Sequence, residues 1–259
     1  MDQEQPQFRE VGAGAKRRRI AYRWDELQGD TALVWLSGFR SDMTGTKVAA
    51  LSDWAREREL SMLRFDYSAH GESDGVLTDA TIGDWLEESI ALFDVMGGRR
   101  AIVVGSSMGG WLALLLARHL AQSNPLSGLV LIAPAFDMTE ALMWRAFTPE
   151  MRTAVETEGL YVHPSAYGEP YPITRSLIEE GRNHLLENAP FDPCCPVRII
   201  QGMRDPDVPW RHALALVDLL QGNDVELTLI KGAEHRLSEP QDLRRLETTI
   251  AALLAASAP

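Results

Sequence analysis

A serine stands between small residues in the segment Gly-Ser-Ser-Met-Gly at residues 105–109. An apolar run at residues 101–105 precedes this segment, and a helical pattern follows it. A G-x-S-x-G segment between a strand and a helix forms a tight turn that exposes the central serine at the edge of a sheet. The amino end of the following helix also favours developing negative charge. This setting predicts that Ser107 is a nucleophile, whereas Ser106 is predicted to be a small packing residue.

Such a serine needs a general base, and His235 has the position that the chemistry requires. It follows the strand predicted at residues 226–230 and precedes the final predicted helix. The chain order of nucleophile, acid and histidine is the one that accompanies this type of turn. His70 is predicted to be a structural loop residue. The remaining histidines, His119, His163, His184 and His212, fall in predicted helices or in a long insertion, and no two of them have metal-ligand spacing. No metal site is therefore expected, and acyl transfer by a serine nucleophile with a histidine base requires no organic cofactor.

Three aspartates compete for the carboxylate that orients this histidine. Asp205 is favoured because it follows the strand predicted at residues 197–201, in a loop that ends in proline. Asp207 lies two residues further along the same loop. Asp137 follows the preceding predicted strand, which is the position of the acid in some hydrolases. Asp207 and Asp137 therefore stay open as alternatives.

An oxyanion hole requires two backbone N–H groups aimed at the charge that develops in the transition state. Met108, the residue after the nucleophile, is predicted to supply one of them. The other is expected from the turn after the predicted strand at residues 32–36, where Phe39 is the natural donor. Gly38 beside it would allow close backbone approach.

The elements that must position these residues are short apolar runs, each followed by a helical pattern. Continuous apolar runs between turns are typical of strands buried on both faces, as in a parallel sheet. The alternation of strand and helix predicts a doubly wound α/β fold with a mostly parallel sheet. The predicted strands are residues 32–36, 62–67, 101–105, 129–133, 197–201 and 226–230.

One interval breaks this alternation and defines the predicted domain organisation. Residues 136–189 show helices and a loop rich in Pro and Tyr but no strand pattern, and an insertion this long is typical of a lid over a site. The hydrolytic core is then expected at residues 16–135 and 190–259. Residues 1–15 are predicted to be a flexible tail.

Charge and composition limit the partners and the compartment. The 259 residues include 25 Lys plus Arg and 37 Asp plus Glu, which gives a formal net charge of −12. This acidity disfavours nucleic acid and anionic membranes as partners. The two cysteines, Cys194 and Cys195, are adjacent and cannot staple a fold, and no secretory pattern is present at the start of the chain. A soluble cytoplasmic protein without membrane insertion is expected.

From about Thr31 to the C-terminus, these segments resemble the α/β-hydrolase superfamily. Residues 65–73 are similar to its D-x-x-G-x-G-x-S loop, residues 202–209 to its acid loop and residues 232–235 to its histidine loop. Three further segments, residues 38–47, 105–111 and 195–198, resemble the branch of mitochondrial palmitoyl-protein thioesterases and acyl-glucuronide hydrolases with its bacterial relatives. One departure is Ser37, which occupies the place of the usual histidine before the oxyanion glycine.

The resemblance and the predicted triad imply a serine hydrolase for carboxylic esters or thioesters of hydrophobic acyl groups. The substrate would be a small acyl ester or thioester or an acylated protein, and the enzyme a monomer or dimer. A serine aminopeptidase, lactonase, perhydrolase or non-hydrolytic binding protein of the same fold are the alternatives. Trp111 in the helix after the nucleophile is a candidate substrate-binding residue. Apolar residues of the insertion are candidates for an acyl pocket, with Trp144 and Tyr161 foremost: Leu142, Met143, Trp144, Phe147, Leu160, Tyr161, Tyr167 and Tyr171.

Overall fold

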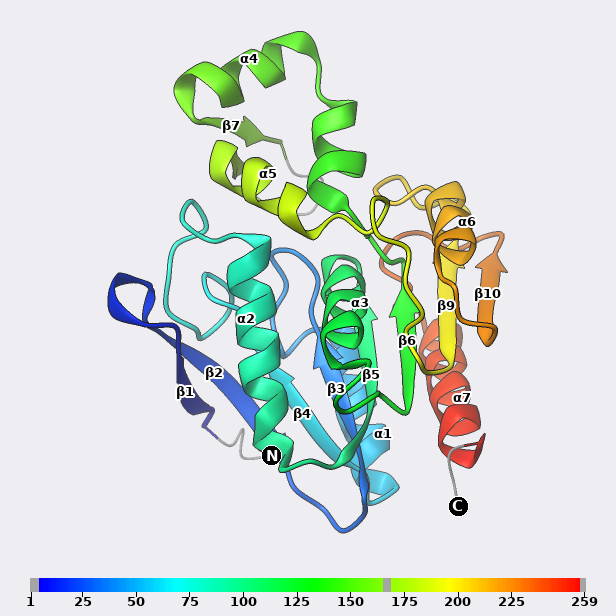
Figure 1. The fold of residues 1–259 in the computed structure, drawn as a ribbon. Helices are drawn as coiled ribbons and strands as arrows, with labels where there is room; N and C mark the ends of the chain where they lie inside the picture. Colours follow the sequence, from blue (N-terminus) through cyan, green and yellow to red (C-terminus); the bar gives the residue numbers. More distant parts are fainter. Residues whose placement is uncertain (1–4, 165–168, 257–259) are drawn as a thin grey trace.

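An eight-stranded sheet forms the centre of the computed structural model, which describes residues 5–164 and 169–256 (Figure 1). The strand order is β1-β2-β4-β3-β5-β6-β9-β10. The strands from β4 to β10 across the sheet pair in parallel, whereas β2 pairs antiparallel with both β1 and β4. The predicted mostly parallel sheet is therefore confirmed. Its strands are β1 (Gln7–Val11), β2 (Arg18–Asp25), β3 (Thr31–Leu36), β4 (Ser61–Phe65), β5 (Arg100–Ser106), β6 (Gly128–Ile132), β9 (Val197–Gly202) and β10 (Val225–Ile230).

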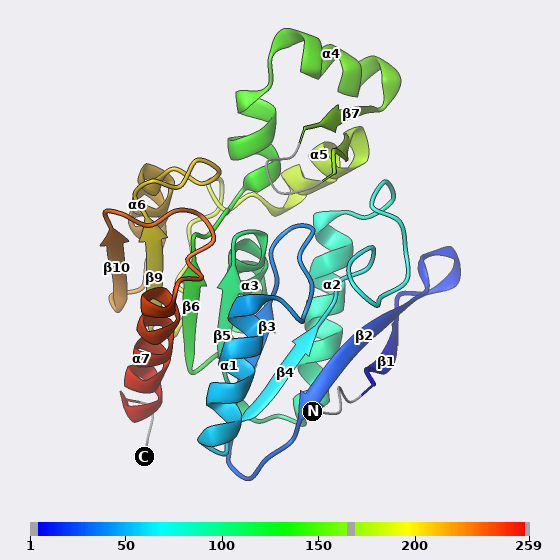
Figure 2. The same cartoon turned by 180° about the vertical axis from the view of Figure 1, so that it is seen from behind.

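Helices cover both faces of this sheet. One face carries α2 (Ile82–Phe93), α3 (Met108–Leu120) and α6 (Trp210–Leu219), and the other carries α1 (Thr46–Glu57) and α7 (Pro240–Ala256) (Figures 1 and 2). Alternation along each strand supplies both cores: in β5, Val103 belongs to the apolar cluster under α2 and α3, and Val104 to the cluster under α1 and α7. Strands buried on both faces explain why the sequence shows continuous apolar runs.

The start of the chain differs from the predicted flexible tail. Residues 7–11 form β1, which pairs with β2 from Gln7 opposite Tyr22 to Val11 opposite Arg18. The pairing covers the outer edge of β2, and Val11 is buried. The prediction of a tail over residues 1–15 is thus wrong from residue 7 onward, because backbone pairing to an open edge needs no strong apolar pattern. Residues 1–4 lie outside the described residues.

The insertion, residues 136–189, stands above the carboxyl ends of the parallel strands (Figures 1 and 2). It contains a hairpin that the sequence did not predict, in which β7 (Leu160–His163) pairs antiparallel with β8 (Tyr171–Thr174). A small apolar cluster of its own holds it together: Phe147, Val155, Ile173 and Ile178. Its helical pieces are a π-helical segment (Met138–Met143), 3-10 turns (Trp144–Ala146 and Arg182–His184), α4 (Pro149–Glu158) and α5 (Arg175–Gly181).

No helix in the described residues is both long enough and apolar enough to span a bilayer.

Candidate active site

Ser107 lies at the turn between β5 and α3 with a backbone conformation of φ 54° and ψ −119°. Positive φ at a residue with a side chain is strained, and such strain is held in place only by the surrounding structure. Close packing supplies that constraint: a Cβ atom on Gly105 would lie 2.3 Å from the Gly109 carbonyl oxygen, and one on Gly109 would lie 2.0 Å from the Leu36 carbonyl oxygen. Both glycines of the G-x-S-x-G segment are therefore required by space.

Three loops at the carboxyl edge of the sheet bring Ser107, His235 and Asp205 together. His235 follows β10 and Asp205 follows β9. The Nε2 atom of His235 lies 3.2 Å from the Oγ atom of Ser107. The Nδ1 atom of the same ring lies 2.7 Å from the Oδ2 atom of Asp205. This is the geometry of a nucleophile, a general base and the carboxylate that fixes the base's tautomer.

The Asp205 carboxylate is buried and fully engaged. Its Oδ1 atom accepts the N–H groups of Asp207 and Val208 at 2.9 and 2.8 Å. Its Oδ2 atom accepts the side-chain amide of Gln201 at 3.1 Å in addition to His235. Gln201 is completely buried and also donates to the Val208 carbonyl, so it ties the acid loop to the end of β9. Sequence reasoning missed this residue; its only signal is its place just before the Gly-x-x-Asp segment.

The two alternative acids have other positions. Asp137 is buried at the start of the insertion, where its oxygens accept the N–H groups of Leu186 and Glu187 at 2.7 and 2.9 Å. Burial raises the pKa of Asp137. It therefore holds the two ends of the insertion together. Asp207 contributes its backbone N–H to Asp205.

Asp205, Asp207 and His235 also form a group whose potential metal-ligand atoms lie within 4.8 Å of one another. The Asp205 oxygens already accept the hydrogen bonds that align a catalytic histidine. The arrangement thus fits a triad, which needs an imidazole free to exchange a proton with Ser107.

The turn after β3, residues 37–41, lies against the nucleophile; it is called the oxyanion turn below. A Cβ atom on Gly38 would lie 3.3 Å from the Cβ atom of Ser107, which shows how closely the two backbones approach. Arg40 has a positive φ of 58°. Its N–H donates to the Nε2 atom of His70 at 2.9 Å, and the Ser41 N–H donates to the Gly38 carbonyl at 3.1 Å. Phe39 lies in this turn, and Met108 is the first residue of α3.

Trp111 does not line an accessible pocket. It is fully buried inside α3 and belongs to the main apolar cluster beneath the sheet's α2 and α3 face. The prediction that it binds substrate is therefore corrected to a core role. All residues of α3 from Met108 to Ala117 are buried, so an aromatic residue one turn after the nucleophile packs inside the core.

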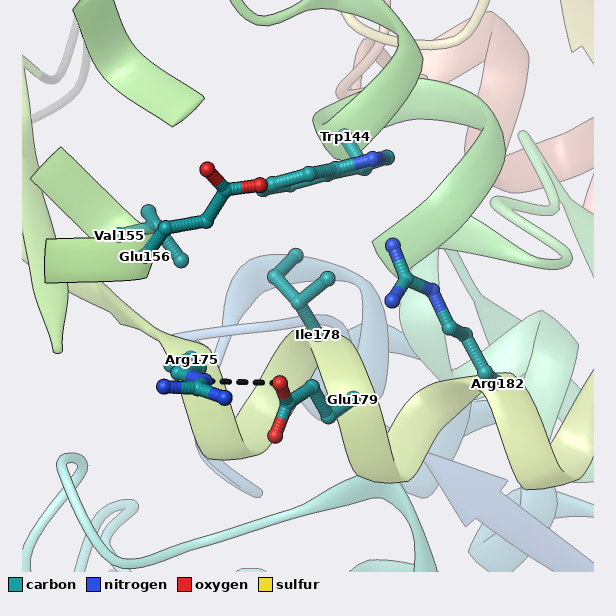
Figure 3. A pocket seen from close by; sticks show the side chains of 7 residues that line it. All are labelled: Trp144, Val155, Glu156, Arg175, Ile178, Glu179 and Arg182. Atoms are coloured by element: carbon teal, nitrogen blue, oxygen red, sulfur yellow. Dashed lines mark hydrogen bonds and ion pairs between the residues drawn. The ribbon is translucent and has the colours of Figure 1, made fainter. Parts of the chain in front are cut away.

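Trp144 and Tyr161 pack on the small apolar cluster of the insertion. Trp144 lines a pocket between α4 and α5, with Arg182 and Ile178 near its ring (Figure 3). Tyr161 lies against Phe147, with ring centroids 6.1 Å apart. The full pocket lining is Trp144, Val155, Glu156, Arg175, Ile178, Glu179 and Arg182.

Tyr171 is the insertion residue that reaches the oxyanion turn. Its ring centroid lies 5.5 Å from that of Phe39, and the Arg40 guanidinium lies 4.6 Å above its ring. Burial raises the pKa of Tyr171, and the Asp207 carboxylate adds to the rise. Tyr167, the other tyrosine of this loop among the pocket candidates, lies outside the described residues.

Residues 28–254 match the model of the alpha/beta hydrolase family. The chain belongs to this family. This alpha/beta hydrolase is 34% identical over 234 residues to the mouse mitochondrial palmitoyl-protein thioesterase ABHD10. The matched region covers 89% of this chain and 77% of the mouse protein. The human protein of the same name is 33% identical over 89% of this chain and 75% of its own length.

Solved structures agree with this membership. A putative hydrolase from Agrobacterium vitis S4 is 44% identical, covers 96% of this alpha/beta hydrolase and 98% of its own chain, and has a TM-score of 0.92. The mouse alpha/beta hydrolase domain-containing protein 10 is 30% identical, and the match covers 97% of this chain and 100% of the mouse chain with a TM-score of 0.86. Est1E from Butyrivibrio proteoclasticus shares the fold, with a TM-score of 0.73. It is 18% identical, and the match covers 96% of this chain and 98% of the Est1E chain.

Proposed function

We propose that this alpha/beta hydrolase cleaves carboxylic ester or thioester bonds by forming an acyl-enzyme on Ser107. The observation that carries the proposal is the hydrogen-bonded series from Asp205 through His235 to Ser107. The strained turn at Ser107, which exposes its hydroxyl beside the oxyanion turn, supports it. The palmitoyl-protein thioesterase names of the mouse and human relatives favour the same chemistry.

In the first half-reaction, Ser107 Oγ attacks the acyl carbonyl carbon while its proton passes to His235 Nε2. The Asp205 carboxylate holds the resulting imidazolium through Nδ1–H. The carbonyl oxygen becomes an oxyanion, for which the N–H groups of Phe39 and Met108 are the proposed donors. Collapse of the tetrahedral intermediate breaks the bond to the leaving group, which departs as an alcohol or thiol with the proton from His235.

In the second half-reaction, water replaces the leaving group. His235 takes a proton from the water, the hydroxide attacks the acyl carbon, and the carboxylic acid leaves Ser107 as the proton returns to its oxygen. The three side chains and water handle every proton and electron pair in both steps. The proposed reaction therefore uses no cofactor.

We infer that the acyl group is hydrophobic. Two partly exposed aromatic rings meet at the oxyanion turn, where the ring centroids of Tyr171 and Phe39 lie 5.5 Å apart. Apolar surface of this kind binds acyl methylenes by excluding water. Small acyl esters, acyl thioesters and acylated proteins are the proposed substrate classes.

A fluorophosphonate probe tests the nucleophile directly. We expect one covalent adduct, located on Ser107 by peptide mass spectrometry. Ser107→Ala should lose the adduct and lower kcat on p-nitrophenyl esters or acyl-CoA thioesters by up to about 10⁶-fold, the loss seen when a triad serine is removed. Ser106→Ala is the matched control and should keep both. Hydrolysis retained in Ser107→Ala, or a wild-type protein that is neither labelled nor active, would overturn the proposal in favour of a binding protein.

A further inference from the structure

We propose that His70 is a positioning residue for oxyanion stabilisation. Its neutral ring accepts the N–H of Arg40 and so holds the oxyanion turn in the conformation that presents Phe39. This inference rests on the proposed function, because it concerns how the transition state of that reaction is stabilised. The sequence alone suggested only a structural loop residue here.

Both ring nitrogens of His70 are engaged, and their partners determine the tautomer. Nδ1 lies 2.9 Å from the carbonyl oxygen of Ser68, which can only accept, so Nδ1 carries the proton. Nε2 lies 2.9 Å from the Arg40 nitrogen, whose N–H can only donate, so Nε2 is the unprotonated acceptor. The observed pair of hydrogen bonds thus requires a neutral ring with one defined tautomer.

The surroundings of His70 fix the ring in space. It is only 5% exposed, and the ring of Trp85 meets it edge-on at a centroid distance of 5.4 Å. The Trp85 indole N–H donates to the same Ser68 carbonyl at 3.1 Å. The Ser68 N–H in turn donates to the buried carboxylate of Glu88 at 2.8 Å. His70 therefore transmits the rigidity of α2 and its packing to the oxyanion turn.

The turn needs such support because its own backbone is unfavourable. Arg40 has φ 58°, in the left-handed region that is unfavourable for a residue with a Cβ. Within the turn, the Ser41 N–H donates to the Gly38 carbonyl. The buried Trp35 indole N–H donates to the Ser37 hydroxyl at the start of the turn, and the bond from Arg40 to His70 ties the far side of the turn to the core. An oxyanion donor is effective when it is already oriented before the charge develops. A released Arg40 peptide would let the adjoining Phe39 amide turn away.

The charges around His70 favour the neutral form. Burial is the largest cause that lowers the pKa of His70, and the Arg40 cation lowers it further, while the Asp42 carboxylate opposes this. Tyr67, the other titratable group packed on the ring, lies at a centroid distance of 5.8 Å, and its own pKa is raised well above the ordinary value by burial. The acceptor at Nε2 is therefore available at neutral pH.

Two amide substitutions distinguish the effect of the hydrogen bond with Arg40 from that of the hydrogen bond with Ser68. In His70→Gln the side-chain oxygen reaches the place of Nε2 and can accept from Arg40 without titrating. In His70→Asn the shorter amide reaches only the place of Nδ1 and can serve only Ser68. Rates are normalised to the fraction of protein labelled by the fluorophosphonate, so that misfolded protein does not count.

We expect His70→Asn to lower kcat/KM for a p-nitrophenyl ester by about 10- to 100-fold, less than the loss of a whole oxyanion donor. Its affinity for a trifluoromethyl ketone, which forms a tetrahedral oxyanion on the serine, should fall by a similar factor. His70→Gln should stay within about threefold of the wild type in both. If His70 only filled space, both variants would have a changed melting temperature. Inhibitor affinity and kcat/KM would then not fall together in His70→Asn while staying unchanged in His70→Gln.

Amide hydrogen exchange at Arg40, followed by NMR, is the second readout and does not depend on activity. Exchange at this N–H should accelerate in His70→Asn and stay slow in His70→Gln. Unchanged kcat/KM and exchange in His70→Asn, or equal losses in both variants, would overturn the positioning role. A wild-type protein without hydrolysis would instead refute the proposed function, while the exchange comparison still decides whether His70 holds the turn.

Discussion

At the residue scale, the proposed catalysis depends on which atoms of His235 carry protons. Asp205 accepts from Nδ1, so Nε2 is left free to take the Ser107 proton. Gln201 and two backbone N–H groups fix the carboxylate, which keeps its Oδ2 atom aimed at the ring. The acid is thus placed by its own loop, before any substrate binds.

Asp205→Asn should lower kcat by about 10⁴-fold, because the amide stabilises the wrong tautomer of His235 while leaving the geometry intact. Steady-state kinetics on a p-nitrophenyl ester measure the loss. Asp207→Asn and Asp137→Asn are the matched controls and should lose far less, since it is the Asp205 carboxylate that accepts from Nδ1 of the His235 ring at 2.7 Å. A larger loss in either control would transfer the role of the acid to that residue.

Lys47 extends the same reasoning to the loop that carries His235. Its Nζ atom donates to the carbonyl of Arg236, the residue after the catalytic histidine, and burial lowers the pKa of Lys47 to about 8. In the unfolded chain the pKa is near the ordinary 10.5. Between these two values the unfolded state binds more protons, so stability attributable to this side chain rises with pH through that window and is lost as pH falls toward 8.

The difference in unfolding free energy between the wild type and Lys47→Met should therefore grow as pH increases from about 8 to 10.5, by at most ~1.4 kcal/mol per pH unit. Urea denaturation at several pH values measures it. The exposed Lys231 provides the control, and Lys231→Met should show no such trend. A difference that stays constant over this range would refute the argument.

At the scale of elements, the hairpin of the insertion places one side chain against the oxyanion turn. Tyr171 on β8 contacts Phe39 and Arg40, whereas Trp144 and Tyr161 pack on the insertion's own cluster. The acyl-pocket role expected for Trp144 and Tyr161 stays a prediction. The contacts give Tyr171 the better position for that role.

If Tyr171 forms a wall of the acyl pocket, kcat/KM should rise with acyl length by up to roughly fourfold per methylene, which corresponds to about 0.8 kcal/mol, until the pocket is full. Tyr171→Ala should flatten this slope on a series of p-nitrophenyl esters, and Tyr171→Phe should keep it. Trp144→Ala, from the pocket between α4 and α5, should flatten the slope less than Tyr171→Ala, because the Trp144 ring packs on the insertion's own cluster. A slope that is the same in Tyr171→Ala and the wild type would show that the insertion does not select the acyl group.

At the scale of the whole molecule, the parallel sheet gathers the catalytic loops at one edge. The loops after β3, β5, β9 and β10 come from distant parts of the chain, and the strand order places them side by side. The carboxyl ends of the strands are where open α/β sheets bind ligands. The net charge of −12 gives the molecule as a whole a long-range field that repels anions.

This field should slow the approach of anionic substrates. For an acyl-CoA thioester, kcat/KM should rise several-fold as salt increases from about 10 mM to 0.3 M, because the Debye length shrinks from about 30 Å to below 8 Å. A neutral p-nitrophenyl ester of the same acyl group is the control and should change little. Equal salt dependence for both substrates, or a falling rate for the thioester, would show that the local charge at the site outweighs the net charge.

The local pattern of residues determined the parallel strands of the sheet, the G-x-S-x-G turn and the chain order of nucleophile, acid and base. Each of these depends on neighbours within a few positions: apolar runs make strands that are buried on both faces, and two glycines are needed where backbones nearly touch. The family follows from the same local segments. The cytoplasmic location expected from the adjacent cysteines stays a prediction, and the relatives are named as mitochondrial proteins.

Only the tertiary structure decided which residues support that chemistry. Trp111 is in the core because every residue of α3 from Met108 to Ala117 is buried, and residues 7–11 form a strand because β2 offers an open edge. His70 and Gln201 acquire their roles through hydrogen bonds to residues that lie on other loops or later in the same loop. Such partners are set by three-dimensional proximity and leave no periodic trace in the sequence, which is why the supporting residues of the site appear only when the chain is folded.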